Sequence, residues 1–324
     1  MNSEQSVKSV FPLFATLRKR FKKERTLHLF VWLGLALLLI FNYIPMFGIL
    51  MAFKNYSIVT GVKGIFTSSW AGLSYFHEFV TDYRFAEIVR NTIILSLLKV
   101  VFTFPAPILF AILLNEARHL LFKRFVQTVS YLPHFISWVV VVGLSFSFLS
   151  TDIGVVNKLL VQWGLAERPL NFLTSANYFW GLAVGSAVWK EMGWWAIIFL
   201  AAISGINPSL YEAAQIDGAG RLARIWHITL PGMRGTIIVV MILTIGSILG
   251  GGLVGSNFEQ AYLLGNTMNN STSEIVQTYA FKVGLADGRY SYAAAIDLIQ
   301  SVISVVLIFS SNAIAKKFSG SSLF

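Results

Sequence analysis

The sequence contains no cysteine, no Gly-Lys dipeptide and few charged residues. Without cysteine the chain has no disulfide, no thiolate metal site and no cysteine nucleophile. A Walker A loop needs the Gly-Lys pair to hold phosphates, so any ATP chemistry has to come from another polypeptide. The five histidines are scattered, and His77-Glu78 lacks the second histidine of a zinc-protease motif. We therefore expect no resident metal or cofactor in this chain and no enzyme activity of its own.

Charge is scarce and apolar residues are abundant. Charged residues make up 12% of the 324 residues and hydrophobic residues 56%, whereas soluble domains carry about 25% charged residues. This leaves too little polar surface for a soluble protein. The chain is predicted to be an integral membrane protein, for which length gives no domain count by the rule for globular chains.

Six apolar windows are long enough to cross a membrane, whose hydrocarbon core of about 30 Å requires about 20 helical residues. They lie near residues 29–51, 92–114, 126–148, 178–203, 235–254 and 293–313. The windows are continuously apolar, which favours helices over the alternating strands of a membrane β-barrel. We predict an all-α membrane protein with about six spans. It divides into a basic segment 1–28, a membrane domain 29–313 and a tail 314–324.

Lysine and arginine predict the orientation, because cytoplasmic loops keep positive charge during insertion. The segments before residue 30 and at 115–125, 204–234 and 314–324 hold 15 basic residues, and the loops 52–91, 150–177 and 255–292 hold 8. Both termini and the 204–234 loop are therefore predicted to be cytoplasmic. The net charge of +10 is interpreted as a topology signal, and no nucleic-acid partner is expected.

A basic cluster precedes the first span and resembles the charged end of a signal peptide. The apolar run after it is too long for a signal peptide and has no small-x-small cleavage site, so it is predicted to stay as an anchor. The cluster is expected to attract anionic lipid headgroups at about 1 kcal/mol per basic residue. Its members are Arg18, Lys19, Arg20, Lys22, Lys23 and Arg25.

The predicted cytoplasmic loop 204–234 begins with a helix signal. Asn207 suits an N-cap and Pro208 a first helical position, so a short helix is predicted over 209–215. The small apolar face of this helix consists of Leu210, Ala213 and Ala214. The polar groups beside it are Glu212, Gln215 and Asp217. Such a surface fits a shallow groove on another protein.

Glycine and proline divide the rest of the loop. Gly218 and Gly220 interrupt the first helix, and a second helix is predicted over 221–229. Pro231 and Gly232 are expected to end this second helix. The loop is thus predicted to be a helix, a sharp glycine bend and another helix. The alternative interpretation is an amphipathic connector with no special role.

The EAA triplet and the residues after it match a known pattern in type and spacing: Glu212, Ala213, Ala214, Asp217, Gly218, Ala219, Ile228, Leu230 and Pro231. The chain thereby resembles the EAA-loop permeases of binding-protein-dependent ABC importers. In that family the loop is a coupling helix that sits in a cleft of the ATP-hydrolysing subunit. The resemblance implies that Glu212 makes a polar contact and that Ala213 and Ala214 pack closely. Gly218 would bend the chain and so aim the helix.

The resemblance extends from the first span to the tail and is strongest for the carbohydrate-uptake group, particularly permeases for oligosaccharides and polysaccharides. Two stretches support this placement, QTVSYLPHFISW at 127–138 and SEIVQTYAFKVGLADGRYSYAAAID at 273–297. The resemblance implies a type I ABC importer fold in the bacterial inner membrane. It also implies a second permease subunit, two ATPase subunits that bind ATP and Mg, and an extracytoplasmic sugar-binding protein that contacts the outer loop 255–292.

Polar residues inside a span are costly and therefore suggest a pathway. Lys190 and Glu191 lie in the fourth window beside Trp194 and Trp195. Aromatic faces can stack on sugar rings, and the adjacent charges can bind hydroxyls or carboxylates, so this cluster is the candidate translocation path. The alternative is an internal ion pair of Lys190 with Glu191 or Asp297, together with interfacial tryptophans.

A second group of polar residues follows the fifth window. Asn257, Glu259 and Gln260 are expected to line the outer mouth of the path. The alternative is that they only solvate a loop.

The predicted function is that of a membrane-spanning subunit of a carbohydrate ABC importer, coupled to a separate ATPase. The sugar can be neutral or contain uronates, as alginate does. An alternative from another class is an ion-gradient-driven secondary transporter or channel, with Lys190, Glu191 and Asp297 as an ion relay. That alternative leaves the EAA loop unexplained. A membrane enzyme acting on lipid or sugar precursors has no motif in its favour.

Overall fold

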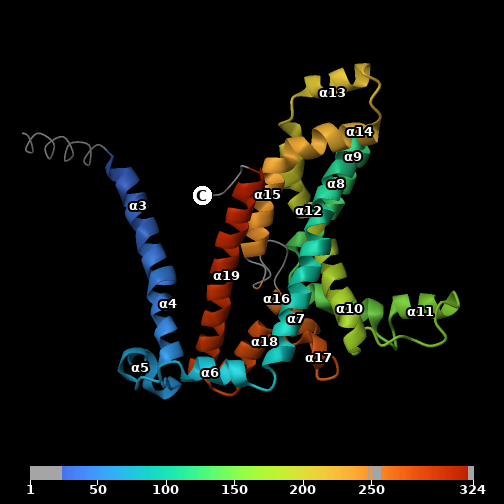
Figure 1. Cartoon of the computed structure of the whole chain (residues 1–324). Coiled ribbons are helices and arrows are strands. Elements are labelled where there is room, and N and C mark those ends of the chain that lie inside the picture. Colours follow the sequence, from blue (N-terminus) through green and yellow to red (C-terminus); the bar gives the residue numbers. More distant parts are fainter. Residues whose placement is uncertain (1–23, 247–248, 250–256, 320–324) are drawn as a thin grey trace, which may run out of the picture.

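A computed structural model of the chain describes residues 24–246, 249 and 257–319, which are almost entirely helical (Figure 1). Within these residues there is no β-strand, only an isolated antiparallel bridge between Lys54 and Trp70. The predicted all-α class is therefore confirmed. The basic cluster before the first span lies outside the described residues, apart from Arg25.

The α-helices are, in chain order, α3 (Arg25–Leu38), α4 (Ile44–Met46), α5 (Gly61–Thr67), α6 (Ser74–Thr81), α7 (Phe85–Leu98), α8 (Pro105–Glu116), α9 (Leu120–Tyr131), α10 (Trp138–Leu149), α11 (Val155–Gln162), α12 (Ala176–Ser204), α13 (Pro208–Ile216), α14 (Arg221–Arg224), α15 (Leu230–Gly246), α16 (Asn257–Leu264), α17 (Asn270–Ser273), α18 (Val276–Phe281) and α19 (Tyr290–Ser319). π-Helical turns occupy Leu39–Tyr43, Lys99–Thr103, Ile225–Thr229 and Lys282–Ala286. 3₁₀ turns occupy Phe47–Phe53, Ile58–Thr60 and Leu132–Phe135.

Several helices are long and apolar enough to cross a membrane. Continuous ones are Arg25–Phe53, Phe85–Glu116, Ala176–Ser204, Arg221–Gly246 and Tyr290–Lys317. A further crossing is formed by Leu120–Phe135 and Trp138–Leu149 if this bent pair is a single span. These segments coincide with the six apolar windows, except that the last residues of the fifth window lie outside the described residues. The prediction of about six membrane helices is confirmed.

The third window differs from the continuous helix expected of it, because its two halves are bent by 105°. Pro133 lies in the 3₁₀ turn that ends the first half. Ser137 then begins a new helix, and its hydroxyl accepts a hydrogen bond from the Val140 N–H at 3.4 Å. A proline that has no N–H to donate and a capping serine thus divide this apolar segment.

The helix after the glycine bend does not end at Pro231 and Gly232, and that prediction was wrong. It runs unbroken over Arg221–Gly246, with the π-helical turn Ile225–Thr229 just before the proline. A π turn bonds each N–H to a carbonyl five residues back. This wider turn accommodates the proline, which would otherwise clash with the carbonyl four residues before it. The loop and the fifth span are therefore joined by one continuous helix.

The long helix α12 packs against α7, α8, α9 and α15, and so forms the centre of the bundle. Its contacts use small side chains: Ala196 is fully buried against a cluster that includes Ala111 of α8. At Gly193 an added Cβ would lie 2.1 Å from the carbonyl oxygen of Ser130 on α9. Only glycine permits this approach of two helix backbones, as is typical of membrane helix pairs.

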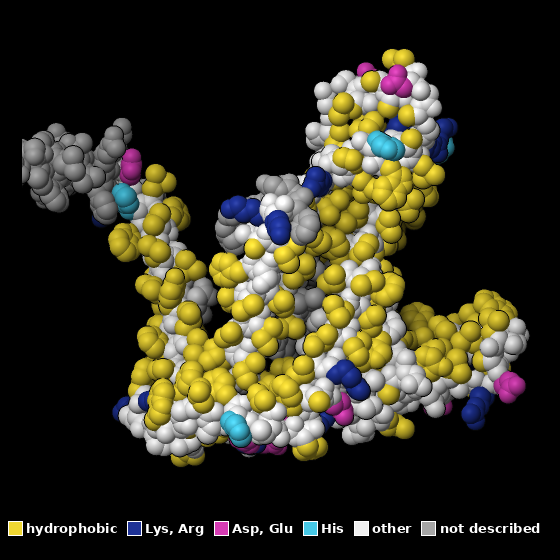
Figure 2. Space-filling view, viewed as in Figure 1, with side chains coloured by type: hydrophobic (Ala, Val, Ile, Leu, Met, Phe, Trp, Pro, Cys, Tyr) yellow, Lys and Arg dark blue, Asp and Glu magenta, His cyan; other side chains and the backbone are white. Residues whose placement is uncertain are grey.

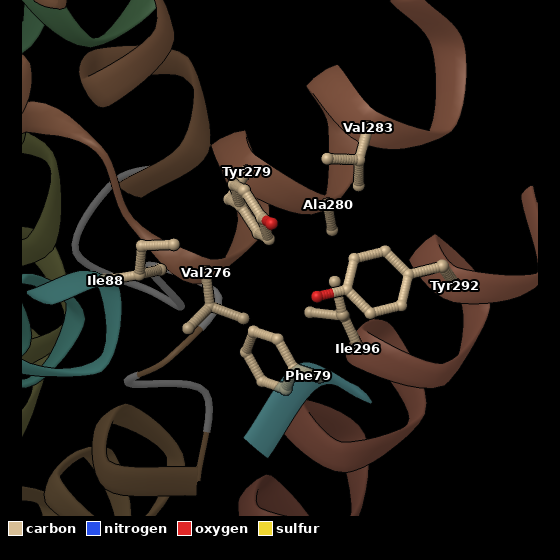
Figure 3. Packing of buried hydrophobic residues seen from close by; sticks show 8 residues of the cluster. All are labelled: Phe79, Ile88, Val276, Tyr279, Ala280, Val283, Tyr292 and Ile296. Carbon is tan, nitrogen blue, oxygen red and sulfur yellow. The ribbon is translucent and has the colours of Figure 1, made fainter. Parts of the chain in front are cut away.

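Residues 257–286, predicted only as part of an outer loop, form α16, α17 and α18 at the end of the molecule opposite α13 (Figure 1). The apolar cluster in Figure 3 packs this segment against α6, α7 and α19, with Phe79 and Ile296 among its buried members. A segment of short helices is thereby fixed by contacts with elements far away in the sequence.

The aromatic residues of this cluster are anchored by a carboxylate. Tyr279 and Tyr292 donate their hydroxyl protons to Asp82 Oδ2 at 2.8 and 3.2 Å. Burial opposes ionisation of Asp82, but hydrogen bonds from the Arg84 N–H and from both tyrosines outweigh it and lower the pKa of this carboxyl. The end of α6 is thus tied to α18 and α19.

Hydrophobic side chains cover the long helices, and charged side chains gather nearer the two ends of the molecule (Figure 2). The first span is the least enclosed: α3 stands apart from α19 along much of its length (Figure 1). Only 6% of the apolar window of Arg25–Phe53 is buried, against 39% for Phe85–Glu116. Lipid tails or another membrane protein must therefore cover most of the first span.

Candidate functional site

The EAA loop, residues 204–234, lies at one end of the molecule (Figure 1). Asn207 caps α13 as predicted, because its Oδ1 accepts a hydrogen bond from the Ser209 N–H at 3.0 Å. Pro208 occupies the first helical position, where no N–H is needed. The first half of the loop is thus fixed by signals that lie within a few residues of each other.

The predicted glycine bend is present at the end of α13. Gly218 has a φ of 78°, and its N–H donates to the Gln215 carbonyl at 3.1 Å. The N–H of Ala219 donates to the Ala214 carbonyl at 2.8 Å, which completes a Schellman motif. No atom lies within 4 Å of the position that a Cβ on Gly218 would occupy. The backbone conformation, and not lack of space, therefore requires glycine here.

Two contacts hold the halves of the loop together. The hydroxyl of Tyr211 on α13 lies 3.0 Å from the Thr229 hydroxyl, and Thr229 is buried in the π-helical turn. At the base of the loop, a Cβ on Gly232 would lie 2.5 Å from Cδ1 of Ile206, so the Ile206 side chain packs directly against the glycine. Leu230 adds a partly buried contact with the cluster between α8 and α12. The loop is therefore attached to the bundle as one unit.

The outer surface of the loop exposes both polar and apolar groups. Glu212, Ala213 and Asp217 are exposed. Near them Ile216 is 86% exposed and Leu222 is 73% exposed. Apolar side chains that project from a polar end of the molecule are typical of a contact surface for another protein. Pro231 is also exposed, whereas Ala214 is half-buried.

The charged pair predicted in the fourth span is an ion pair within the molecule. Lys190 Nζ lies 3.1 Å from Glu191 Oε1, and both side chains are 6% exposed. The second carboxylate oxygen of Glu191 lies 2.7 Å from Nδ1 of His134. Lys190 also donates to the His134 carbonyl at 2.6 Å. Of the two partners considered for Lys190, the structure pairs it with Glu191 and not with Asp297.

His134 was missed by the sequence analysis, although it lies in the 127–138 stretch. Its ring stacks on Trp194 with 4.5 Å between centroids and an angle of 1° between the planes. The His134 side chain is 28% exposed, so these stacked rings are the accessible part of the cluster. The buried charges hold the bend of the third span against α12.

The remaining candidates occupy different positions. Asn257 is fully buried, and its amide donates to the Ser96 hydroxyl on α7 at 3.2 Å. It therefore packs α16 against the second span in this conformation. Trp195 is half-buried, and its indole N–H has no hydrogen-bond partner within the described residues. Among those residues, no three histidine, aspartate or glutamate side chains lie together as a metal site would require.

Residues 103–320 match the family described as "Binding-protein-dependent transport system inner membrane component". The chain is 45% identical over 303 residues to Protein LplB of Bacillus subtilis (strain 168), which covers 94% of this chain and 92% of that protein. It is 42% identical over 302 residues to the polygalacturonan/rhamnogalacturonan transport system permease protein YteP of the same bacterium, with coverages of 93% and 91%.

Two solved structures contain similar chains. One is the crystal structure of a bacterial ABC transporter involved in the import of the acidic polysaccharide alginate, with a TM-score of 0.84 and 36% identity. The other is a bacterial alginate ABC transporter in complex with an alginate pentasaccharide-bound periplasmic protein, with a TM-score of 0.83 and 35% identity. Each match covers 94% of this chain and 99% of the other chain.

Proposed function

The chain belongs to the family of binding-protein-dependent transport system inner membrane components, and on this premise we propose that it is the membrane-spanning subunit of an importer for an oligosaccharide or polysaccharide. Relatives named for polygalacturonan and for alginate support the substrate class. The chain is a multi-pass inner-membrane protein, and its role is to form a path and not to catalyse a reaction.

The geometry of the EAA loop carries this proposal. A short helix with exposed Glu212, Ala213 and Asp217 projects from one end, next to exposed Ile216 and Leu222. These residues form the contact with a separate ATPase subunit, and Ala214, Gly218, Leu230 and Pro231 set the position of the helix. A sugar permease without a motor would have no use for such a surface.

The assembly that follows contains a second permease subunit and two ATPase subunits, which bind ATP and Mg. An extracytoplasmic binding protein delivers the sugar, as the structure of a similar chain with a sugar-bound periplasmic protein supports. Both termini and the EAA loop are cytoplasmic. Segment 255–292 then faces the binding protein at the opposite end.

Transport is by alternating access. ATPase closure moves the EAA loop, and the continuous helix Arg221–Gly246 passes this movement into the fifth span without an intervening hinge. The sugar path includes the Trp194 ring, stacked on His134, and the neighbouring residues Trp195, Lys190 and Glu191. Lys190, Glu191 and Asn257 are buried, so their contact with sugar requires the spans to separate during the cycle.

Extraction of the protein from its native membrane in mild detergent, followed by mass spectrometry, tests the assembly. We expect the wild type to retain a second permease and an ATPase, and Glu212→Lys to lose the ATPase because the charge on the contact surface is reversed. Glu167→Lys is the matched control, since Glu167 is an exposed carboxylate between α11 and α12. Recovery of the chain alone, from all preparations and in several detergents, would overturn the proposal.

Uptake measurements separate this motor-driven import from gradient-driven transport. Glu212→Lys at normal abundance is expected to abolish uptake, and an uncoupler is expected to leave wild-type uptake intact while cellular ATP stays high. Uptake that stops with the uncoupler and survives in Glu212→Lys would instead indicate a secondary transporter.

A further inference from the structure

We propose that a cavity beside α16 and α18, at the end opposite the EAA loop, is a subsite for the carboxylate of a uronate residue in the transported sugar. The cavity has a volume of about 430 Å³. Its polar and aromatic lining includes Tyr262, Asn266, Thr267, Asn270, Glu274 and Lys282. This inference rests on the proposed function, because it places the site on the side where a binding protein delivers sugar.

The cation that lines the cavity, Lys282, shares its acidic partner with a second cation. The Glu274 side chain is 1% exposed and forms ion pairs with Arg84 and with Lys282, whose Nζ lies 2.9 Å from Glu274 Oε1. Asn270 also donates to this carboxylate at 3.2 Å. Glu274 is therefore shared by two cations, of which Arg84 also interacts with the Asp82 carboxylate.

Of the two cations that share Glu274, Lys282 is the more accessible. Its side chain is 49% exposed, whereas that of Arg84 is 22% exposed. Burial and the nearby Arg84 guanidinium lower the pKa of Lys282, so a further anion beside this ammonium would stabilise its charged form. An ammonium with three donors can hold Glu274 and a ligand carboxylate together.

The rest of the lining suits a sugar ring. Tyr262 is 46% exposed, and its ring stacks on Phe258 with 5.5 Å between centroids and meets Phe281 edge-on at 5.2 Å. A ring fixed in this way presents a flat apolar face to the C–H groups of a sugar. The Thr267 hydroxyl can bond to a sugar hydroxyl, whereas the Asn266 amide already bonds to the Leu173 carbonyl and to the Met268 and Asn269 N–H groups.

A neighbouring cavity of about 400 Å³ shows why the carboxylate belongs in the first one. Phe258 and Phe281 line this second cavity together with Gln277 and Asp297. The Asp297 carboxylate has no ion pair or hydrogen bond within the described residues. It can accept hydrogen bonds from sugar hydroxyls and offers no positive charge to an acidic group. The aromatic cluster thus separates a cavity for an acidic group from one for hydroxyls.

The test compares a short oligogalacturonide with its methyl ester, which has the same backbone and no charge, in the complete transporter. We expect Lys282→Met to weaken binding and uptake of the acidic sugar about tenfold, the size expected for one charge-assisted contact, and to leave the ester unchanged. Lys282→Arg should retain the preference for the acidic sugar. Lys158→Met is the control, since it removes an exposed cation from α11 at the same end.

Each result decides a separate point. An equal loss for the acid and the ester would show that Lys282 only supports the fold, and no loss for either would remove it from the path; both results overturn the subsite. A wild type that imports the ester and rejects the acid would overturn the subsite while the proposed importer stands. A wild type that imports no saccharide of any kind would overturn the proposed function itself.

Discussion

Glu191 is the counter-ion of more than one buried cation. It forms an ion pair with Lys190, and its charge also attracts Lys99, which is 2% exposed in the second span. Its second carboxylate oxygen is hydrogen-bonded to His134. Removing one partner of a buried pair costs about 3–5 kcal/mol, because the remaining charge is left uncompensated. We expect Glu191→Gln to lower the thermal unfolding temperature in detergent clearly, and Glu167→Gln, at an exposed position, to leave it unchanged.

A double variant distinguishes charge compensation from simple loss of contact. Lys190→Met combined with Glu191→Leu removes both charges and should recover part of the lost stability. The recovery should be incomplete, because Lys99 also loses the attraction of the Glu191 charge. If Glu191→Gln unfolds at the wild-type temperature, the ion pair contributes nothing to the stability of the fold. The inference that it holds the third span against α12 would then be wrong.

The sequence predicted this pair among two alternatives, but it could not select one. Lys190 and Glu191 are neighbours in the sequence, so their proximity could be predicted without knowing the fold. Whether Asp297 also reaches Lys190 depends on where α19 packs, which the sequence does not show. His134 lies 57 residues from Glu191, and one histidine in an apolar stretch gives no signal of such a partner. The contacts that hold the site together are long-range, and only the fold reveals them.

At the scale of elements, a hydrogen bond between Tyr211 and Thr229 joins the two halves of the EAA loop. If the Tyr211–Thr229 bond makes α13 and the following helix move together, its loss should weaken coupling and leave ATP binding intact. We expect Tyr211→Phe and Thr229→Val each to reduce the sugar imported per ATP hydrolysed by about twofold to tenfold, as one hydrogen bond of about 0.5–1.5 kcal/mol allows. The measurement is the ratio of uptake to ATP hydrolysis in proteoliposomes.

Tyr178→Phe is the matched control for this experiment. Tyr178 lies in the first turn of α12, and its hydroxyl makes no hydrogen bond within the described residues. An unchanged transport ratio in Tyr211→Phe and Thr229→Val would show that the loop is rigid without this bond. Loss of the ATPase from the complex would indicate a docking defect and would also contradict the prediction.

Local signals explain which elements could be predicted. The N-cap at Asn207 and the bend at Gly218 each need only neighbouring residues, and both were predicted correctly. The passage of a helix through Pro231 depends on a π-helical turn, which no local propensity indicates. The helices α16–α18 are short and are held by distant contacts such as that of Asn91 with the Glu274 carbonyl at 3.0 Å. Such elements are specified by tertiary packing, and the sequence pattern alone does not reveal them.

At the scale of the whole molecule, the chain has the form of an incomplete bundle. The helices at its centre bury each other, but the first span is enclosed only near its C-terminal end, where the 3₁₀ turn Phe47–Phe53 packs against α19. Apolar side chains therefore face outward along most of Arg25–Phe53. This shape fits a subunit whose membrane surface is completed by a second permease.

The two ends of the molecule should lie on opposite sides of the membrane. More basic residues lie in the segments predicted to share a side with the EAA loop than in the loops predicted for the other side. This distribution favours a cytoplasmic position for the EAA loop. Because the sequence has no cysteine, single cysteines can report sidedness without background labelling. His119 precedes α9 and Thr267 lies between α16 and α17, and both are exposed. Neither belongs to the proposed ATPase contact.

We expect a membrane-impermeant maleimide to label His119→Cys only in inside-out vesicles and Thr267→Cys only in right-side-out vesicles. The reason is that an odd number of spans separates the two positions if the bent pair Leu120–Phe135 and Trp138–Leu149 crosses once. Labelling of both from one side would mean that this pair enters and leaves on the same side. His119 and the EAA loop would then be separated by one span, Ala176–Ser204, and would lie on opposite faces, so the topology that places both in the cytoplasm would be wrong.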